Sequence, residues 1–141
     1  MKIPEWMRQV LLRVVWRVME RRRPDFVLPD YMFRWHLLRT RWGCLYVHWI
    51  VGDDDDRALH DHRSWTVSAM LTGSYREVFA DGYRDVRHGD VVARKATTPH
   101  RLVIGDDHAL TLFLTGPHRR EWGFVTADGW VRHDVYLQAQ R

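Results

Sequence analysis

The sequence predicts an all-β protein, a closed sandwich or barrel of jelly-roll type, preceded by one amphipathic helix. From Tyr31 onward, short runs rich in aromatic and β-branched residues recur at near-regular spacing, with glycine-containing turns between them. The segment before them instead has apolar residues at spacings of three and four. A chain of 141 residues that is 45% hydrophobic fits one domain with a sizeable core. We therefore expect a helix within residues 1–24 and a single β domain at 25–141.

The predicted helix begins near Pro4 and ends before Pro24, because proline suits the first helical position and cannot continue a helix. Its apolar positions are Ile3, Met7, Val10, Leu11, Val14 and Val18. Seven Lys/Arg against two Glu give residues 1–23 a charge of +5, whereas the remaining 15 basic and 16 acidic residues sum to −1. The arginines interrupt any membrane-spanning or signal-peptide pattern. We expect the helix to pack on the domain or on a second subunit, with binding to a membrane surface or nucleic-acid phosphates as the alternative.

The predicted strands begin with a hairpin of Tyr31–Leu38 and Cys44–Val51. An acidic loop, Gly52–Asp56, follows; it lacks the ligand spacing of a calcium loop and is expected to be solvated. Beyond the histidine segment, Gly73 and Gly105–Asp107 are interpreted as turns, and no second helix is expected. The later predicted strands are Ser74–Ala80, Tyr83–His88, Val91–Ala96, Arg101–Ile104, His108–Thr115, Arg120–Val125 and Trp130–Leu137.

Two histidines one residue apart are the strongest functional signal. On an extended segment His60 and His62 point to the same side, so they can share one ligand. Neutral imidazole is a common ligand of Zn, Fe, Ni, Mn and Cu, and His100 is the candidate for a third ligand from a distant strand. Alternation also places Ser64, Thr66, Ser68 and Met70 on the histidine side.

The chain from about Arg57 to Leu114 resembles the cupins, the RmlC-like double-stranded β-helix proteins. His60, His62 and Gly73 keep the spacing of the first cupin motif, although Thr66 or Val67 stands where that motif has Glu. Gly89 and His100 keep the separation of the second motif, in which Lys95, Thr97 and Ile104 replace its Pro, Gly and Asn. The 15 residues between Gly73 and Gly89 suit the short inter-motif loop of compact cupins.

A closer similarity is to small uncharacterised cupins of phages and bacteria, from which no reaction can be transferred. It lies in residues 54–62, 113–117 and 120–124. The wider resemblance implies a cupin jelly-roll barrel and a metal held by His60, His62 and His100, as in the three-histidine thiol dioxygenases. Other cupins have lost the metal and serve as epimerases, binding modules or storage proteins. Cupins also commonly form pairs, which implies a homodimer.

Three neutral imidazoles leave the full dication charge on the site and favour an anionic ligand. We therefore expect a metal-dependent enzyme, oxygenase-like or isomerase-like, that uses Fe(II) or else Zn, Ni or Mn on a small polar or anionic substrate. The alternative is a non-catalytic cupin that binds a small ligand or a partner.

Further site residues are weaker candidates. Tyr46, His48 and Tyr75 are candidate catalytic groups; His48 could also be a fourth ligand or a structural histidine. Arg120 and Trp122 are candidates for substrate contacts, or for an ion pair packed on an aromatic ring. Asp61 should point away from the two histidines, in a structural role with Arg57 or Arg63 as partner.

Other classes of protein are disfavoured by what the sequence lacks. There is no Gly-x-Ser-x-Gly elbow for a serine nucleophile and no glycine-rich phosphate loop. The His60-Asp61 pair lies in a β context, unlike the His-Asp doublet of helical phosphohydrolases. The single cysteine, Cys44, cannot form an internal disulfide, so the cytoplasm is the expected compartment.

Overall fold

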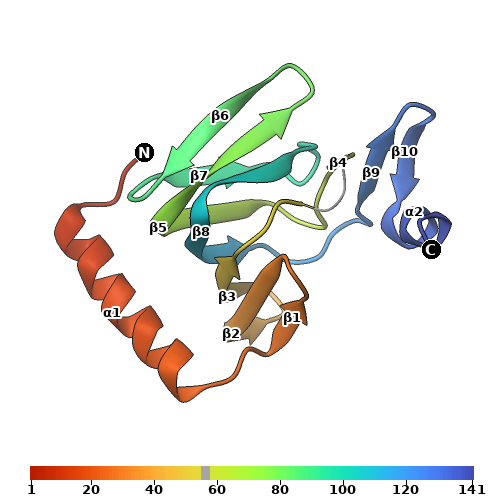
Figure 1. Ribbon diagram of the computed structural model, residues 1–141. Helices are drawn as coiled ribbons and strands as arrows, with labels where there is room; N and C mark the ends of the chain where they lie inside the picture. Colours follow the sequence, from red (N-terminus) through yellow and green to blue (C-terminus); the bar gives the residue numbers. More distant parts are fainter. Residues whose placement is uncertain (55–57) are drawn as a thin grey trace.

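The computed structural model describes residues 1–54 and 58–141, and it confirms a mostly β architecture behind an N-terminal helix (Figure 1). The helices are α1 (Glu5–Arg21) and α2 (His133–Ala139). The strands are β1 (Phe26–Leu28), β2 (Met32–Thr40), β3 (Gly43–Ile50), β4 (Leu59–His60), β5 (Thr66–Phe79), β6 (Gly82–Arg87), β7 (Val91–Arg94), β8 (Arg101–Thr115), β9 (Gly123–Thr126) and β10 (Gly129–Arg132).

The strands form two antiparallel sheets. The large sheet has the order β1-β2-β3-β8-β5-β6, and β7 also pairs with β5. The small sheet has the order β10-β9-β4. The predicted hairpin of residues 31–38 and 44–51 is confirmed as β2 and β3, in which Trp35 lies opposite Val47. Figure 1 shows the small sheet, with α2 beside it, to one side of the large sheet.

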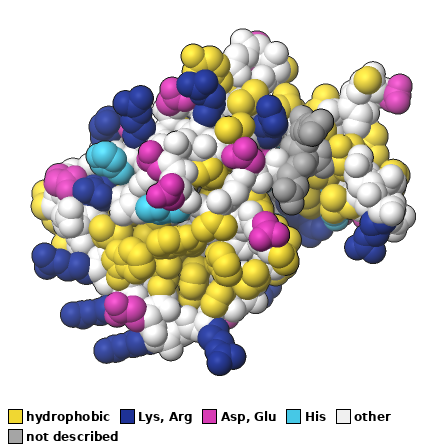
Figure 2. All heavy atoms as spheres, viewed as in Figure 1, with side chains coloured by type: hydrophobic (Ala, Val, Ile, Leu, Met, Phe, Trp, Pro, Cys, Tyr) yellow, Lys and Arg dark blue, Asp and Glu magenta, His cyan; other side chains and the backbone are white. Residues whose placement is uncertain are grey.

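The helix α1 covers the outer face of the large sheet. Its buried Val15 packs with Trp35, Val47, Leu71 and Leu110, and four more apolar helix residues surround this cluster. Burial of this apolar face stabilises a helix that its own propensity would leave marginal. Figure 2 shows Lys and Arg side chains along the edge of the molecule where α1 lies in Figure 1. The expectation that the helix packs on the domain is confirmed.

The predicted turns at Gly73 and at Gly105–Asp107 are wrong, because each lies within a continuous strand. Gly73 lies within β5 and Gly105 within β8, and the two strands pair along most of their length. The pairing register shifts between Met70 and Thr72 and again between Gly73 and Tyr75, so glycine here accommodates β-bulges. A bulge keeps the strand continuous but changes which residues face inward.

The prediction for the C-terminal run is also wrong. Only its beginning is a strand, and residues His133–Ala139 form α2. Tyr136 on this helix stacks on Phe124 of β9, with ring centroids 4.3 Å apart. A short run of aromatic and β-branched residues does not distinguish a strand from a helix whose contacts come from the tertiary structure.

The described part of the acidic loop is less solvated than expected. Asp53 accepts a hydrogen bond of 2.7 Å from the amide of Ile104, and Asp54 accepts one of 2.7 Å from Leu102. These carboxylates therefore satisfy backbone donors of β8. Residues 55–57, which complete the predicted loop and include Arg57, lie outside the described residues.

Neither described helix combines the length and apolar character that crossing a membrane requires.

Candidate metal centre

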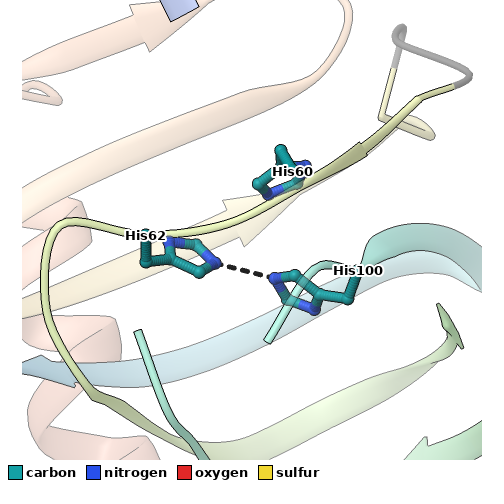
Figure 3. Close-up of side chains that lie close together, drawn as sticks. All are labelled: His60, His62 and His100. Carbon is teal, nitrogen blue, oxygen red and sulfur yellow. Dashed lines mark hydrogen bonds between the residues drawn. The ribbon is translucent and has the colours of Figure 1, made fainter. Parts of the chain in front are cut away.

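Three histidines from two segments of the chain converge at one point between the sheets (Figure 3). His60 ends β4, His62 follows it, and His100 immediately precedes β8. Each offers a ring nitrogen, and these atoms all lie within 4.8 Å of one another. The Nε2 atoms of His62 and His100 are 2.7 Å apart. The predicted trio is therefore brought together by the fold.

Backbone pairing fixes the positions of these histidines. The amide of His60 donates to the carbonyl of His100, and the amide of His100 donates to the carbonyl of His60, both at 2.9 Å. The amide of His62 donates to the carbonyl of Ala96, also at 2.9 Å. Extended backbone at residues 60–62 directs His60 and His62 to one side, as the alternation predicted.

A buried carboxylate lies behind His100. The Nδ1 atom of His100 is hydrogen-bonded to Glu77, which is fully buried on β5. A carboxylate at Nδ1 favours the tautomer whose Nε2 lone pair is free for a metal and fixes the plane of the ring. The sequence pattern does not reveal Glu77, since alternation counted from Thr66 places residue 77 on the opposite face. The bulges at Gly73 reverse that parity, and Tyr75 and Glu77 turn inward.

Arginines compensate the charge of Glu77. Arg94 donates to both of its carboxylate oxygens, and Arg84 donates to Oε2 at 2.8 Å. Arg94 also donates to the Ser68 hydroxyl at 2.9 Å. Burial by itself raises the pKa of Glu77, but the hydrogen bonds from His100 and Arg94 outweigh burial and hold this pKa well below its usual range. Glu77 is therefore a permanent anion that orients His100.

The imidazole of His62 is held in the neutral form that metals require. Burial, followed by the neighbouring His100 and His60, lowers the pKa of His62 well below its usual value. A dication at this point would replace the 2.7 Å contact between His62 and His100 with bonds to both nitrogens. Three neutral imidazoles, one of them oriented by a carboxylate, form a donor set that suits a first-row dication.

A cavity of about 1190 Å³ opens in front of the histidines. The inner face of the large sheet forms one wall, and residues of β4, β9 and α2 contribute to the other. The polar residues predicted to share the histidine side, Ser64, Thr66 and Ser68, line it as expected. Its volume is large enough for a small organic molecule.

The three candidate catalytic residues also line the cavity, but none is poised as a base. Burial raises the pKa of Tyr46, and burial raises the pKa of Tyr75, whose hydroxyl accepts a hydrogen bond of 2.8 Å from Arg94. His48 accepts a hydrogen bond of 2.9 Å at Nε2 from Arg34 and stacks on Phe113. His48 is thus a structural histidine, outside the group of three.

Acid is expected to destabilise the fold through His48. Burial, and then the charge of Arg34, lowers the pKa of His48 well below 6.5, so its ring stays neutral in the folded protein. Below about pH 6.5 the unfolded chain binds more protons than the folded protein, so the free energy of unfolding falls as the pH drops. Urea unfolding of metal-free protein at about pH 7.5 and pH 5 should show this loss. In His48→Gln, whose amide oxygen still accepts from Arg34, the loss should be smaller; an equal loss would contradict the assignment.

The two candidates for substrate contacts, Trp122 and Arg120, have different surroundings in the structure. Trp122 lines the cavity, with its ring centroid 6.2 Å from that of His60. Arg120 instead donates to Asp61 at 2.7 Å and to the carbonyl of His62 at 3.0 Å. Asp61 is buried and structural, as predicted, but its described ionic partner is Arg120 and not Arg63. Arg120 therefore supports the histidine segment from behind.

Comparison with known proteins places the chain by its fold. No family model matches the sequence, and no curated protein matches it. Among solved structures, KdgF from Halomonas sp. is similar at a TM-score of 0.56 and 17% identity, over 71% of this chain and 92% of that one. The DMSP lyase DddQ from Ruegeria pomeroyi DSS-3 has a TM-score of 0.56 and 16% sequence identity, over 70% of this chain and 55% of that one. A cupin superfamily protein from Desulfitobacterium hafniense DCB-2 has a TM-score of 0.53 and 14% sequence identity, over 65% of this chain and 83% of that one. These similarities cover about two thirds of this chain at low sequence identity, and they show a shared fold.

Proposed function

We propose that this chain, which has the cupin fold, is a metal-dependent enzyme that binds a first-row dication through His60, His62 and His100. Its substrate would be a small polar or anionic molecule held in the adjoining cavity. The observation that carries the proposal is the convergence of the three imidazoles, with Glu77 hydrogen-bonded behind His100. The similarity to the fold of a DMSP lyase and of KdgF supports it as an analogy of fold alone.

We expect Fe(II), with Zn, Ni and Mn as alternatives; neutral imidazole is a common ligand of Fe, Zn and Ni. A bound dication would act as a Lewis acid, or would activate oxygen if it were iron. The protein residues have their own parts: Glu77 orients His100, and the cavity wall would hold the substrate beside the histidines. An oxygenase-like or isomerase-like reaction is the expected class.

A non-catalytic cupin that binds a small ligand is the second candidate. It is favoured by the commitment of His48 to Arg34 and by the raised pKa of both Tyr46 and Tyr75. Assays with metal-loaded protein distinguish the two. Turnover of a small acid, thiol or nucleotide, followed by mass spectrometry and oxygen uptake, supports the enzyme, whereas saturable binding of the same compound without turnover supports the binding protein.

Metal content is the first measurement. Untagged protein purified without chelator should contain about one metal ion per chain by mass spectrometry, and His60→Ala/His100→Ala should contain less than about a tenth of that. The double variant His36→Ala/His88→Ala is the matched control, because it removes the same number of histidines away from the site. It should keep the metal.

The proposal fails if wild-type protein stays empty after anaerobic loading with Fe(II), Zn, Ni and Mn. It fails equally if the control variant loses as much metal as His60→Ala/His100→Ala, since binding would then be non-specific.

A further inference from the structure

The cavity contains a second, independent functional group, the guanidinium of Arg34. This arginine lies on the inner face of β2, opposite His48 of β3, and it lines the cavity. Its Nε donates to His48 at 2.9 Å. Its Cζ lies 4.9 Å from the ring centroid of Tyr46 and 5.4 Å from that of Phe26. One hydrogen bond and two aromatic rings therefore fix the direction of the guanidinium.

The charge of Arg34 has no carboxylate partner among the described residues. The acidic groups that act on it are Tyr46, Tyr31 and Cys44, and none of these is a carboxylate. Burial lowers the pKa of Arg34, as expected for an enclosed cation with no carboxylate beside it among the described residues. A guanidinium has five N–H donors, and the hydrogen bond to His48 uses only one of them.

Arg94, in the same cavity wall, shows the contrast. It is more deeply buried than Arg34, and Glu77, Ser68 and Tyr75 accept hydrogen bonds from all three of its nitrogens. Arg94 therefore uses four of its five N–H donors within the protein and has at most one left for a ligand. Among the described residues neither Nη group of Arg34 has a hydrogen-bond partner, so both can bind a ligand.

The other charged groups around the cavity do not neutralise Arg34. Asp54 also lines it, but its carboxylate accepts from the amide of Leu102 and lies 3.9 Å from His60 Nδ1. Arg63 lines the cavity as well, and it adds positive charge. Among the described residues, three arginines and one aspartate thus line the space, and Glu77 offsets Arg94 from behind. The cavity is net positive even before any metal binds.

Two hydroxyls in the wall also lack partners. Thr66 Oγ1 and Thr115 Oγ1 are buried without a hydrogen bond within the described part of the chain. They lie opposite one another on β5 and β8, and both line the cavity. Thr115 is four residues along β8 from Thr111, the partner of His48, which corresponds to about 13 Å of strand. The wall of the cavity thus has polar side chains both beside Arg34 and at the Thr66–Thr115 pair.

We propose that Arg34 is an anion-binding residue and that the substrate of this cavity is an organic carboxylate with an aromatic or apolar body. The two Nη groups match the two oxygens of a planar carboxylate, which pairs with arginine through parallel hydrogen bonds. The body would lie against the rings of Tyr46 and Phe113, which flank His48. This inference adds a substrate class to the proposed function. It rests on the proposed function only for the reaction that follows binding.

The test uses benzoate as the probe and its neutral isostere benzamide as the reference. Metal is removed with phenanthroline, because a chelator that carries carboxylates would compete for the same site. Calorimetry on this metal-free protein should show benzoate binding at least about tenfold more tightly than benzamide, as expected for a charge-assisted hydrogen bond. Binding without metal separates this inference from the metal proposal, so either one can fail alone.

Variants assign the preference to Arg34. Arg34→Met should reduce the ratio of the benzoate and benzamide affinities to about one, and Arg34→Lys should retain part of it. Arg76→Met is the matched control, because Arg76 is exposed and paired with Asp85; it should bind as wild type does. Circular dichroism checks folding, and if Arg34→Met does not fold, the ratio in the wild type and in Arg34→Lys decides.

Three results would overturn the inference. The first is wild-type protein that binds benzoate no better than benzamide. The second is a preference that persists in Arg34→Met and disappears in Arg63→Met, which would assign the anion to Arg63. The third is tighter binding of phenylphosphonate than of benzoate, which would make the cavity a phosphate site.

Discussion

Replacing Glu77 with alanine is expected to lower the free energy of unfolding by about 3 to 5 kcal/mol, because it leaves the buried guanidinium of Arg94 without its anion. Glu77 is fully buried, and it accepts hydrogen bonds from Arg94, Arg84 and His100. Urea unfolding of metal-free protein measures the loss. Asp85→Asn is the matched control: it removes a carboxylate that pairs with Arg76 at the surface, and such pairs contribute at most about 1 kcal/mol.

The same residue is expected to set metal affinity. Glu77→Gln keeps the shape of the side chain but removes the anion that orients His100, so affinity should fall by about 10- to 100-fold. The pair Glu77→Leu/Arg94→Met separates the two roles, because an apolar pair often replaces a buried ion pair at little cost in stability. This double variant should unfold at a urea concentration near the wild-type midpoint, and its metal affinity should stay below that of the wild type. Wild-type affinity in Glu77→Gln would show that the carboxylate does not position the ligand.

Substituting Gly73 with alanine is expected to cost about 2 to 4 kcal/mol, the combined effect of a strained backbone and a collision. Its φ is +78°, and a Cβ atom there would lie 1.9 Å from the carbonyl oxygen of His108 on the paired strand. Gly89→Ala is a close control, since Gly89 has φ +87° and no neighbouring atom within 4 Å of the place that a Cβ would take. That variant should lose only about 1 kcal/mol. Thermal unfolding of both variants measures the difference, and equal losses would remove the collision from the explanation.

The sequence was sufficient for the fold and for the three histidines, because both depend on patterns local in sequence or on motif spacing. His60 and His62 point together through simple alternation over three residues. Glu77 and Arg94 could not be found in the same way. Their inward direction depends on bulges near Gly73 and on pairing with strands far along the chain.

The errors have a common physical origin in tertiary contacts. Gly73 indicates a turn or a bulge equally well until its pairing partner is known. The helix α2 is too short to show a helical period, and its contact with the small sheet decides its conformation. Asp61 finds Arg120, 59 residues away, and no local pattern connects the two.

The reciprocal backbone hydrogen bonds between His60 and His100 have a thermodynamic consequence. The conformational entropy of bringing these two ligands together is lost when the chain folds, before any ion arrives. Binding energy is therefore not consumed in ordering the site, in contrast to zinc fingers, in which metal binding and folding are one event. Added metal should raise the stability of an already folded protein only by mass action, by about 2.7 kcal/mol at a free concentration one hundred times the dissociation constant.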